Sequence, residues 1–276
     1  FSELPGGEPS RVTPYIQVSF FSVPRAMQEV SGFSGIGTSL TWFRDPKLWT
    51  PKEGTTEGAK GGWEVDGQGG LVLRPPSKKD FWRKTYYEPL LCKDDGACLF
   101  AEVGEDAAAT LETEFTLTPK RQFDQAGLCA RLDCEHWIKT GIEVVDGSPR
   151  LSCVVTNGFS DWSTQTWRMD PSGDTVSLRI RMSKMGSKGA YVVEASEGGK
   201  ELFIVRICYM SRGHGGTGAT DQGLCDEGPP APDGKVWMGV FGCCPEEQEG
   251  GCDVWFKSFS VKGGTSFHHN ADGNAA

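Results

Sequence analysis

Short segments in which apolar and polar residues alternate follow one another along most of the chain. Residues 175–182, TVSLRIRM, are the clearest case, because every second residue from Val176 to Met182 is apolar and those between are polar. This period of two is typical of a β-strand with one buried face. No stretch has sustained apolar spacing of the helical kind, so we expect little helix and an all-β sandwich. Strands are expected at about 81–87, 97–102, 109–117, 125–132, 136–145, 150–156, 163–169, 174–183, 190–195, 201–209, 235–242 and 253–262.

The segment 136–145 carries unusual chemistry on one side. If it is a strand, its even-numbered positions are largely apolar, while its other face presents an aromatic ring, a cation, a gap and an anion: Trp137, Lys139, Gly141 and Glu143. Such a face can bind a ligand. It can equally be an ordinary solvated sheet face with an incidental ion pair.

The segment 201–210, ELFIVRICYM, is apolar on both faces apart from Arg206. A strand of this kind is typical of the centre of a sheet that is covered on both sides. A buried Arg206 then needs a carboxylate or carbonyl partner, since an unpaired buried charge costs several kcal/mol.

Length and composition fit one sandwich domain with extensions at both ends. The 276 residues include 37 Gly and 16 Pro, which divide the chain into short elements. Residues 1–37 predict an N-terminal arm, because Pro5, Pro9, Pro14 and Pro24 interrupt its apolar part. We expect the sandwich at 38–263 and a flexible tail at 264–276.

The formal net charge of −9, spread along the chain, argues against nucleic acid or an anionic membrane as a partner. The sequence contains no run of about 20 apolar residues, so no transmembrane segment is predicted. No cofactor is predicted. Paired CxxC motifs, which would indicate zinc, and acidic strings, which would indicate calcium, are both missing from the sequence.

The ten cysteines allow two interpretations. Three pairs bracket short turn-like or glycine-rich segments and could form local disulfides, which would imply an oxidising compartment. Alternatively, the thiols are free and serve as small core residues. The possible disulfide partners are Cys92 with Cys98, Cys208 with Cys225, and Cys244 with Cys252.

Five ordered motifs carry a resemblance to a known family: DFW at 80–82, DQAGL at 124–128, WIKTGIE at 137–143, VVT at 154–156 and SDWS at 160–163. Later signatures are Arg206 with Tyr209, GVF at 239–241 followed by Pro245, and VWFKSFSV at 254–261. Together they resemble the concanavalin-A-like family of unknown function whose fungal members are called regulation of enolase proteins. The likeness spans about residues 40–262.

The resemblance implies a concanavalin A-like jelly-roll sandwich of two antiparallel sheets, one of them concave, and a cytoplasmic location. Aromatic plates beside amide and charged groups on a concave sheet suit a sugar, because a sugar stacks through its apolar ring face and hydrogen-bonds through its hydroxyl groups. The residues expected on this face as ligand-binding groups are Trp82, Gln125, Arg131, Trp137, Lys139, Glu143, Asp161, Trp162 and Arg206.

Three functions remain open from the sequence. The leading one is a non-catalytic binding module for a carbohydrate or sugar-like small molecule. The second is a structural or regulatory subunit of a larger protein assembly, docked through residues 1–37 and 211–234. The third is a carbohydrate-active hydrolase or lyase. No catalytic residue is predicted, because the sequence lacks the ExDxxE string of the jelly-roll glucanases and only Glu143 and Asp161 are possible partners.

Overall fold

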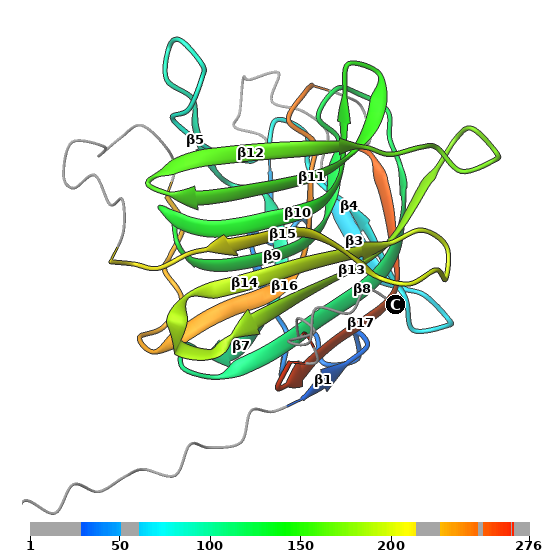
Figure 1. Ribbon diagram of the computed structural model, residues 1–276. Helices are drawn as coiled ribbons and strands as arrows, with labels where there is room; N and C mark the ends of the chain where they lie inside the picture. Colours follow the sequence, from blue (N-terminus) through cyan, green and yellow to red (C-terminus); the bar gives the residue numbers. More distant parts are fainter. Residues whose placement is uncertain (1–28, 51–60, 214–226, 248–250, 266, 268–276) are drawn as a thin grey trace, which may run out of the picture.

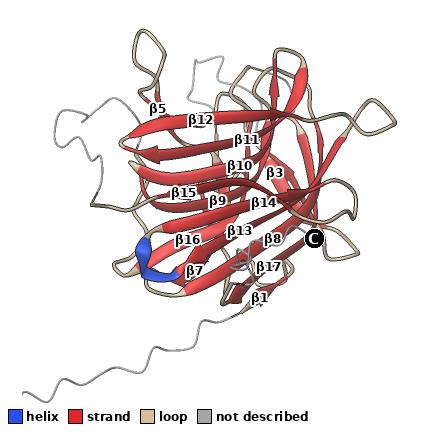
Figure 2. Cartoon of the chain, viewed as in Figure 1, coloured by secondary structure: helices blue, strands red, loops and turns tan. Residues whose placement is uncertain are grey.

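The structure, a computed structural model, describes residues 29–50, 61–213, 227–247, 251–265 and 267. Two large antiparallel sheets pack face to face, and a short two-stranded hairpin lies beside them (Figures 1 and 2). The helical content of the described part is a single 3₁₀ turn, Gly186–Lys188. The predicted all-β sandwich is therefore confirmed.

The first sheet has eight strands. Its order is β15 (Phe203–Tyr209), β14 (Ala190–Ser196), β13 (Val176–Met185), β8 (Ala108–Thr118), β17 (Asp253–Gly263), β4 (Leu71–Arg74) and β3 (Gly62–Val65), with β1 (Val30–Ser31) added against β17.

The second sheet has seven strands. Its order is β12 (Phe159–Thr166), β11 (Ser148–Asn157), β10 (His136–Val145), β9 (Gln125–Asp133), β16 (Lys235–Cys243), β7 (Ala97–Gly104) and β2 (Thr41–Phe43). The separate hairpin pairs β5 (Phe81–Arg83) with β6 (Cys92–Asp94). We call residues 77–95 the cover hairpin.

Alternation along the strands builds the main core between the two sheets. On β13 the apolar positions from Val176 to Met182 are at most 1% exposed. The intervening Arg179 and Arg181 face outward and both donate to the carboxylate of Glu112 on β8. The sequence pattern thus fixes which face of this strand is buried.

A second apolar cluster lies on the outer face of the seven-stranded sheet, where the cover hairpin packs. Phe81 of the hairpin contacts Trp137 of β10, with ring centroids 5.8 Å apart. Both rings are fully buried. Gly96 permits this close packing, since a Cβ there would lie 2.3 Å from the Phe81 ring. The hairpin therefore covers much of a face that the sequence predicted to be open.

A buried ion pair fixes the hairpin to the sheet. Arg131 of β9 donates to Asp94 of β6 at 2.7 Å, and the two side chains are 0% and 1% exposed. Asp94 also accepts the N–H of Gly228, and Arg131 donates to the carbonyl of Pro229. Burial raises the pKa of Asp94, while the neighbouring Arg131 opposes that rise.

Two sequence-based predictions are wrong in detail. The apolar strand β15 lies at the edge of its sheet, not at the centre, and exposes Phe203, Ile204, Ile207 and Tyr209. Apolarity on both faces does not by itself distinguish a covered strand from an apolar edge. The sandwich also begins before residue 38, because Val30 pairs with Val261 and Phe33 is buried in the main core.

The described residues form no helix that is both long enough and apolar enough to span a membrane.

We expect the Asp94→Asn variant to be strongly destabilised. The substitution leaves Arg131 buried without its counter-charge, which costs about 3–5 kcal/mol in comparable buried pairs. Urea denaturation measures the loss. Lys257→Ala is the control, because Lys257 and Glu114 form a pair on the exposed side of β17 and β8, and its removal should change the free energy of unfolding by less than about 1 kcal/mol. An equally small loss in Asp94→Asn would contradict a fixing role for the buried pair.

Candidate functional site

A cavity of about 180 Å³ remains open between the cover hairpin and the seven-stranded sheet. Its walls combine aromatic, acidic and basic side chains from the hairpin, from strands β10 and β12, and from the loops before β9 and after β16. The lining residues are Lys78, Asp80, Trp82, Tyr87, Leu91, Lys93, Phe123, Glu143, Trp162, Pro245 and Glu246.

Lys139 organises the polar floor of this cavity. Its ammonium donates to Asp80 Oδ1 at 2.9 Å, and the same oxygen accepts the Gln125 side-chain amide at 2.9 Å. Desolvation opposes the charge on Lys139, but Asp80 and Glu143 outweigh it and raise the pKa of the ammonium. Lys139 therefore holds its positive charge in a site where it is 3% exposed.

Glu143 lies at the other side of Lys139 and faces the cavity. Ser152 donates a hydrogen bond of 2.7 Å to its carboxylate, and Trp162 donates from its indole nitrogen to Ser152 at 2.9 Å. Burial raises the pKa of Glu143, while Lys139 and Ser152 oppose the rise. The carboxyl group is thus oriented by Ser152 and reaches the pocket with little exposure to water.

Three aromatic side chains form one wall. Trp82 meets Trp162 edge to face at 6.2 Å, and meets Tyr87 in the same manner at 5.8 Å. The Trp82 indole N–H donates to the carbonyl of Thr85, which fixes the ring. Trp162 is 37% exposed and is the most accessible of these three rings. This wall places aromatic surface beside the polar floor.

The structure brings together five of the nine predicted ligand-binding residues at or beneath the cavity: Trp82, Gln125, Lys139, Glu143 and Trp162.

Two others belong to the protein interior. Trp137 is 0% exposed and packs on Phe81, and Arg131 is engaged by Asp94. Their prediction as ligand contacts is wrong, because the cover hairpin occupies the space in front of them. No local signal in the sequence places that hairpin over β9 and β10.

Asp161 and Arg206 lie away from the cavity and bind each other at 2.8 Å, where β12 approaches β15. Arg206 also donates to the carbonyl of Cys153. The expectation that Arg206 finds a carboxylate or carbonyl partner is confirmed, although the pair is a link between the two sheets and no part of the pocket.

Sequence reasoning missed several residues of the site, above all Asp80, Tyr87 and Ser152. Asp80 could have been predicted from the sequence, because it is the first residue of the DFW motif that contains Trp82. Ser152 shares the outer face of its strand with Val154 and faces the gap left by Gly141. Its pairing with Glu143 depends on strand register, which the sequence does not state.

The nine cysteines in the described residues are all free thiols. Cys92 and Cys98 are not joined: Cys98 points into the outer cluster beside Cys129, and Cys92 lies on β6. Cys208 contacts Cys153 across the two sheets, while Cys225 lies outside the described residues. Cys244 and Cys252 are neighbours, with their sulfurs 3.3 Å apart and unbonded.

The docking segments proposed from the sequence fall largely outside the described residues. Of residues 211–234, the described part after the gap packs on the body of the domain, since Gly228 and Pro229 contact the Asp94–Arg131 pair. Docking on a partner through residues 1–28 or 214–226 stays a prediction.

Sequence comparison identifies similar proteins in Saccharomyces cerevisiae and Emericella nidulans. The chain is 31% identical to regulation of enolase protein 1 of Saccharomyces cerevisiae over 194 residues, which cover 70% of this chain and 81% of that protein. It is 27% identical to an uncharacterised protein of Emericella nidulans over 97 residues, covering 34% of this chain and 47% of that protein.

Comparison with solved structures also identifies similar proteins. A functionally unknown Saccharomyces cerevisiae protein matches with a TM-score of 0.60 and 27% identity, covering 83% of this chain and 98% of that one. A xylan β-1,4-xylosidase of Bacillus halodurans matches with a TM-score of 0.50 and 12% identity over 70% of this chain and 33% of its own, which shows a shared fold. The model of a protein family of unknown function, DUF1349, matches residues 59–263, and the chain belongs to this family.

Proposed function

We propose that this protein is a non-catalytic β-sandwich module that binds one sugar ring, or a sugar-like metabolite, in the cavity beside the cover hairpin. The observation that carries the proposal is the combination in one pocket of the Trp82, Tyr87 and Trp162 wall with the Asp80 and Glu143 carboxylates. A sugar needs both kinds of surface, because its ring carbons are apolar and its hydroxyl groups require directed hydrogen bonds.

The size of the cavity limits the ligand to a small molecule. Its volume of about 180 Å³ is below the range of about 300–1,000 Å³ that is usual for drug-sized ligands. The cover hairpin and the buried Phe81–Trp137 contact cover much of the outer face around the cavity. A single ring therefore fits the proposal, and an oligosaccharide lying along the sheet does not.

The polar groups are arranged for holding a ligand. Asp80 Oδ1 already accepts bonds from Lys139, Gln125 and the backbone N–H of Phe81. These three hydrogen bonds fix the position of the carboxylate. The xylosidase named above shares the fold, which favours a sugar-like ligand by analogy only.

A regulatory role is the second candidate. The name of the yeast relative points to the control of another protein, and the apolar edge strand β15 is a surface on which an extended segment of a partner can add a strand.

Trp162→Ala should weaken binding of the sugar by at least about tenfold, or ~1.4 kcal/mol, because it removes the exposed stacking surface. Isothermal titration with the methyl glycosides of common pyranoses measures the effect. Trp255→Ala is the matched control, since Trp255 is also 37% exposed but lies on β17 of the other sheet. Equal affinities of the wild type and the Trp162 variant, both folded, would contradict the proposed pocket.

The Glu143→Gln variant tests whether the pocket only binds a ligand or also catalyses a reaction. Burial raises the pKa of Glu143, and Glu143 lines the same cavity as Asp80, which are features that suit a general acid. We expect no turnover of aryl glycosides or glycans by the wild type, and sugar binding within about threefold in the variant, because glutamine keeps an acceptor for Ser152. Wild-type turnover that disappears in the variant would establish a hydrolase or lyase instead.

A further inference from the structure

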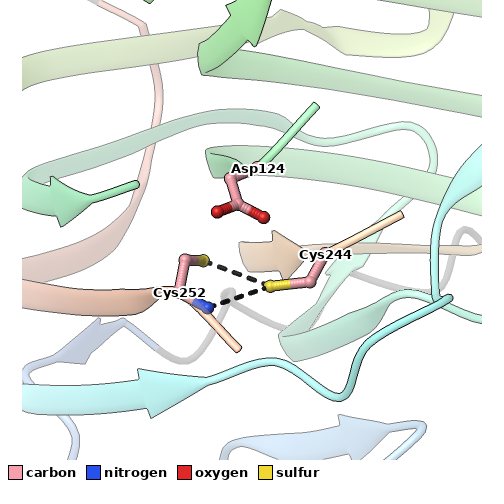
Figure 3. A group of neighbouring side chains, drawn as sticks. All are labelled: Asp124, Cys244 and Cys252. Carbon is pink, nitrogen blue, oxygen red and sulfur yellow. Dashed lines mark hydrogen bonds between the residues drawn. The ribbon is translucent and has the colours of Figure 1, made fainter. Parts of the chain in front are cut away.

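A group of two cysteines and one aspartate lies directly behind the wall of the cavity. Asp124 begins the approach to β9, Cys244 follows β16 and Cys252 precedes β17. All three are 0% exposed, and their carboxylate and sulfur atoms lie within 4.8 Å of one another. Figure 3 shows the Asp124 carboxylate directed toward the space between the two sulfurs.

Hydrogen bonds hold the three groups in this arrangement. The Cys252 backbone N–H donates to Cys244 Sγ at 3.2 Å, and the Cys244 thiol donates to Cys252 Sγ at 3.3 Å. Asp124 Oδ2 accepts the backbone N–H groups of Lys120 at 2.7 Å and Arg121 at 2.9 Å. The donor atoms are therefore positioned by the fold, which lowers the cost of binding an ion.

We propose that Asp124, Cys244 and Cys252 bind one divalent transition-metal ion, with zinc as the expected metal. Two sulfurs and one carboxylate supply three of the four donors of a tetrahedral zinc ion, and both are ligand types that zinc accepts in proteins. Thiolates on one tetrahedral zinc, with Zn–S distances of about 2.3 Å, lie roughly 3.8 Å apart. The observed 3.3 Å separation needs a smaller movement to reach that spacing than to reach the ~2.04 Å of a disulfide.

The charges balance in the buried site. Each thiol loses its proton as its sulfur binds the metal, so the ion exchanges its two positive charges for two protons released to solvent. The cluster has a charge of −1 from Asp124 before binding and keeps a charge of −1 afterwards. The cost of burying an additional net charge is thus avoided.

The position of the cluster gives the ion a structural role. Phe123 and Pro245, the neighbours of two ligands, line the cavity, and Cys244 forms isolated bridges with Ser77 and Lys79 at the start of the cover hairpin. One ion would therefore tie together the segments of Asp124, Cys244 and Cys252, and the first two of these contribute residues to the cavity wall. That last consequence rests on the proposed function, whereas metal binding itself does not.

Cobalt titration of the reduced, chelator-treated full chain tests the site. We expect one cobalt per chain with sulfur-to-cobalt charge-transfer absorption, its displacement by zinc, and a higher melting temperature with zinc. Cys252→Ser and Asp124→Asn should lower the affinity by at least about 100-fold, since even partners of the ligands cost 10–100-fold. Cys134→Ser, a partly exposed thiol outside the cluster, is the control and should bind as the wild type does.

Wild-type protein that takes up no cobalt in the reduced state would overturn the proposal, and so would a Cys134→Ser effect equal to that of Cys252→Ser. A Cys244–Cys252 disulfide that forms on oxidation, in protein that binds no metal when reduced, is the same negative result. Because metal uptake is read without sugar, one chain that binds metal but no sugar, or sugar but no metal, identifies which of the two proposals has failed.

Discussion

The buried contact between Arg131 and Asp94 determines what the outer face of this sandwich can do. Two charges without access to water are tolerated only as a complete, hydrogen-bonded pair, and this pair joins the sheet to the cover hairpin. With the hairpin in place, Phe81 covers Trp137 and most of the face becomes protein interior. Among the described residues, the cavity of about 180 Å³ stays open beside the hairpin on this face.

The packing of the cover hairpin on the sheet also determines the chemistry of the cavity. Burial makes Lys139, Asp80 and Glu143 depend on one another, since a lone charge there would be costly, and it leaves Trp162 as the accessible ring. The backs of the walls are formed by residues 123–124 and 244–246, where the Asp124, Cys244 and Cys252 cluster lies. The pocket and the proposed metal site therefore share these two chain segments, and Cys252 completes the metal site from a third segment.

Alternation along the strands was enough to predict an all-β sandwich and the face on which Lys139 and Glu143 lie, because it depends on neighbouring residues only. The jelly-roll arrangement was implied by the family resemblance. The motifs DFW and SDWS contain Trp82 and Trp162, and both side chains line the cavity. The burial of Trp137, the edge position of β15 and the meeting of Asp124 with Cys244 could not be predicted. Each depends on contacts between segments distant in sequence, which no local pattern records.

The most direct test of the account is the position of a bound sugar among the tryptophans. In ¹⁵N-resolved NMR spectra, titration with a methyl pyranoside that binds should move the indole N–H signals of Trp82 and Trp162. The signals of Trp137, buried under the hairpin, and Trp255, on the other sheet, should stay in place. A binding sugar that moves Trp255 and leaves Trp162 unchanged, or the absence of any binding pyranoside, would contradict the account.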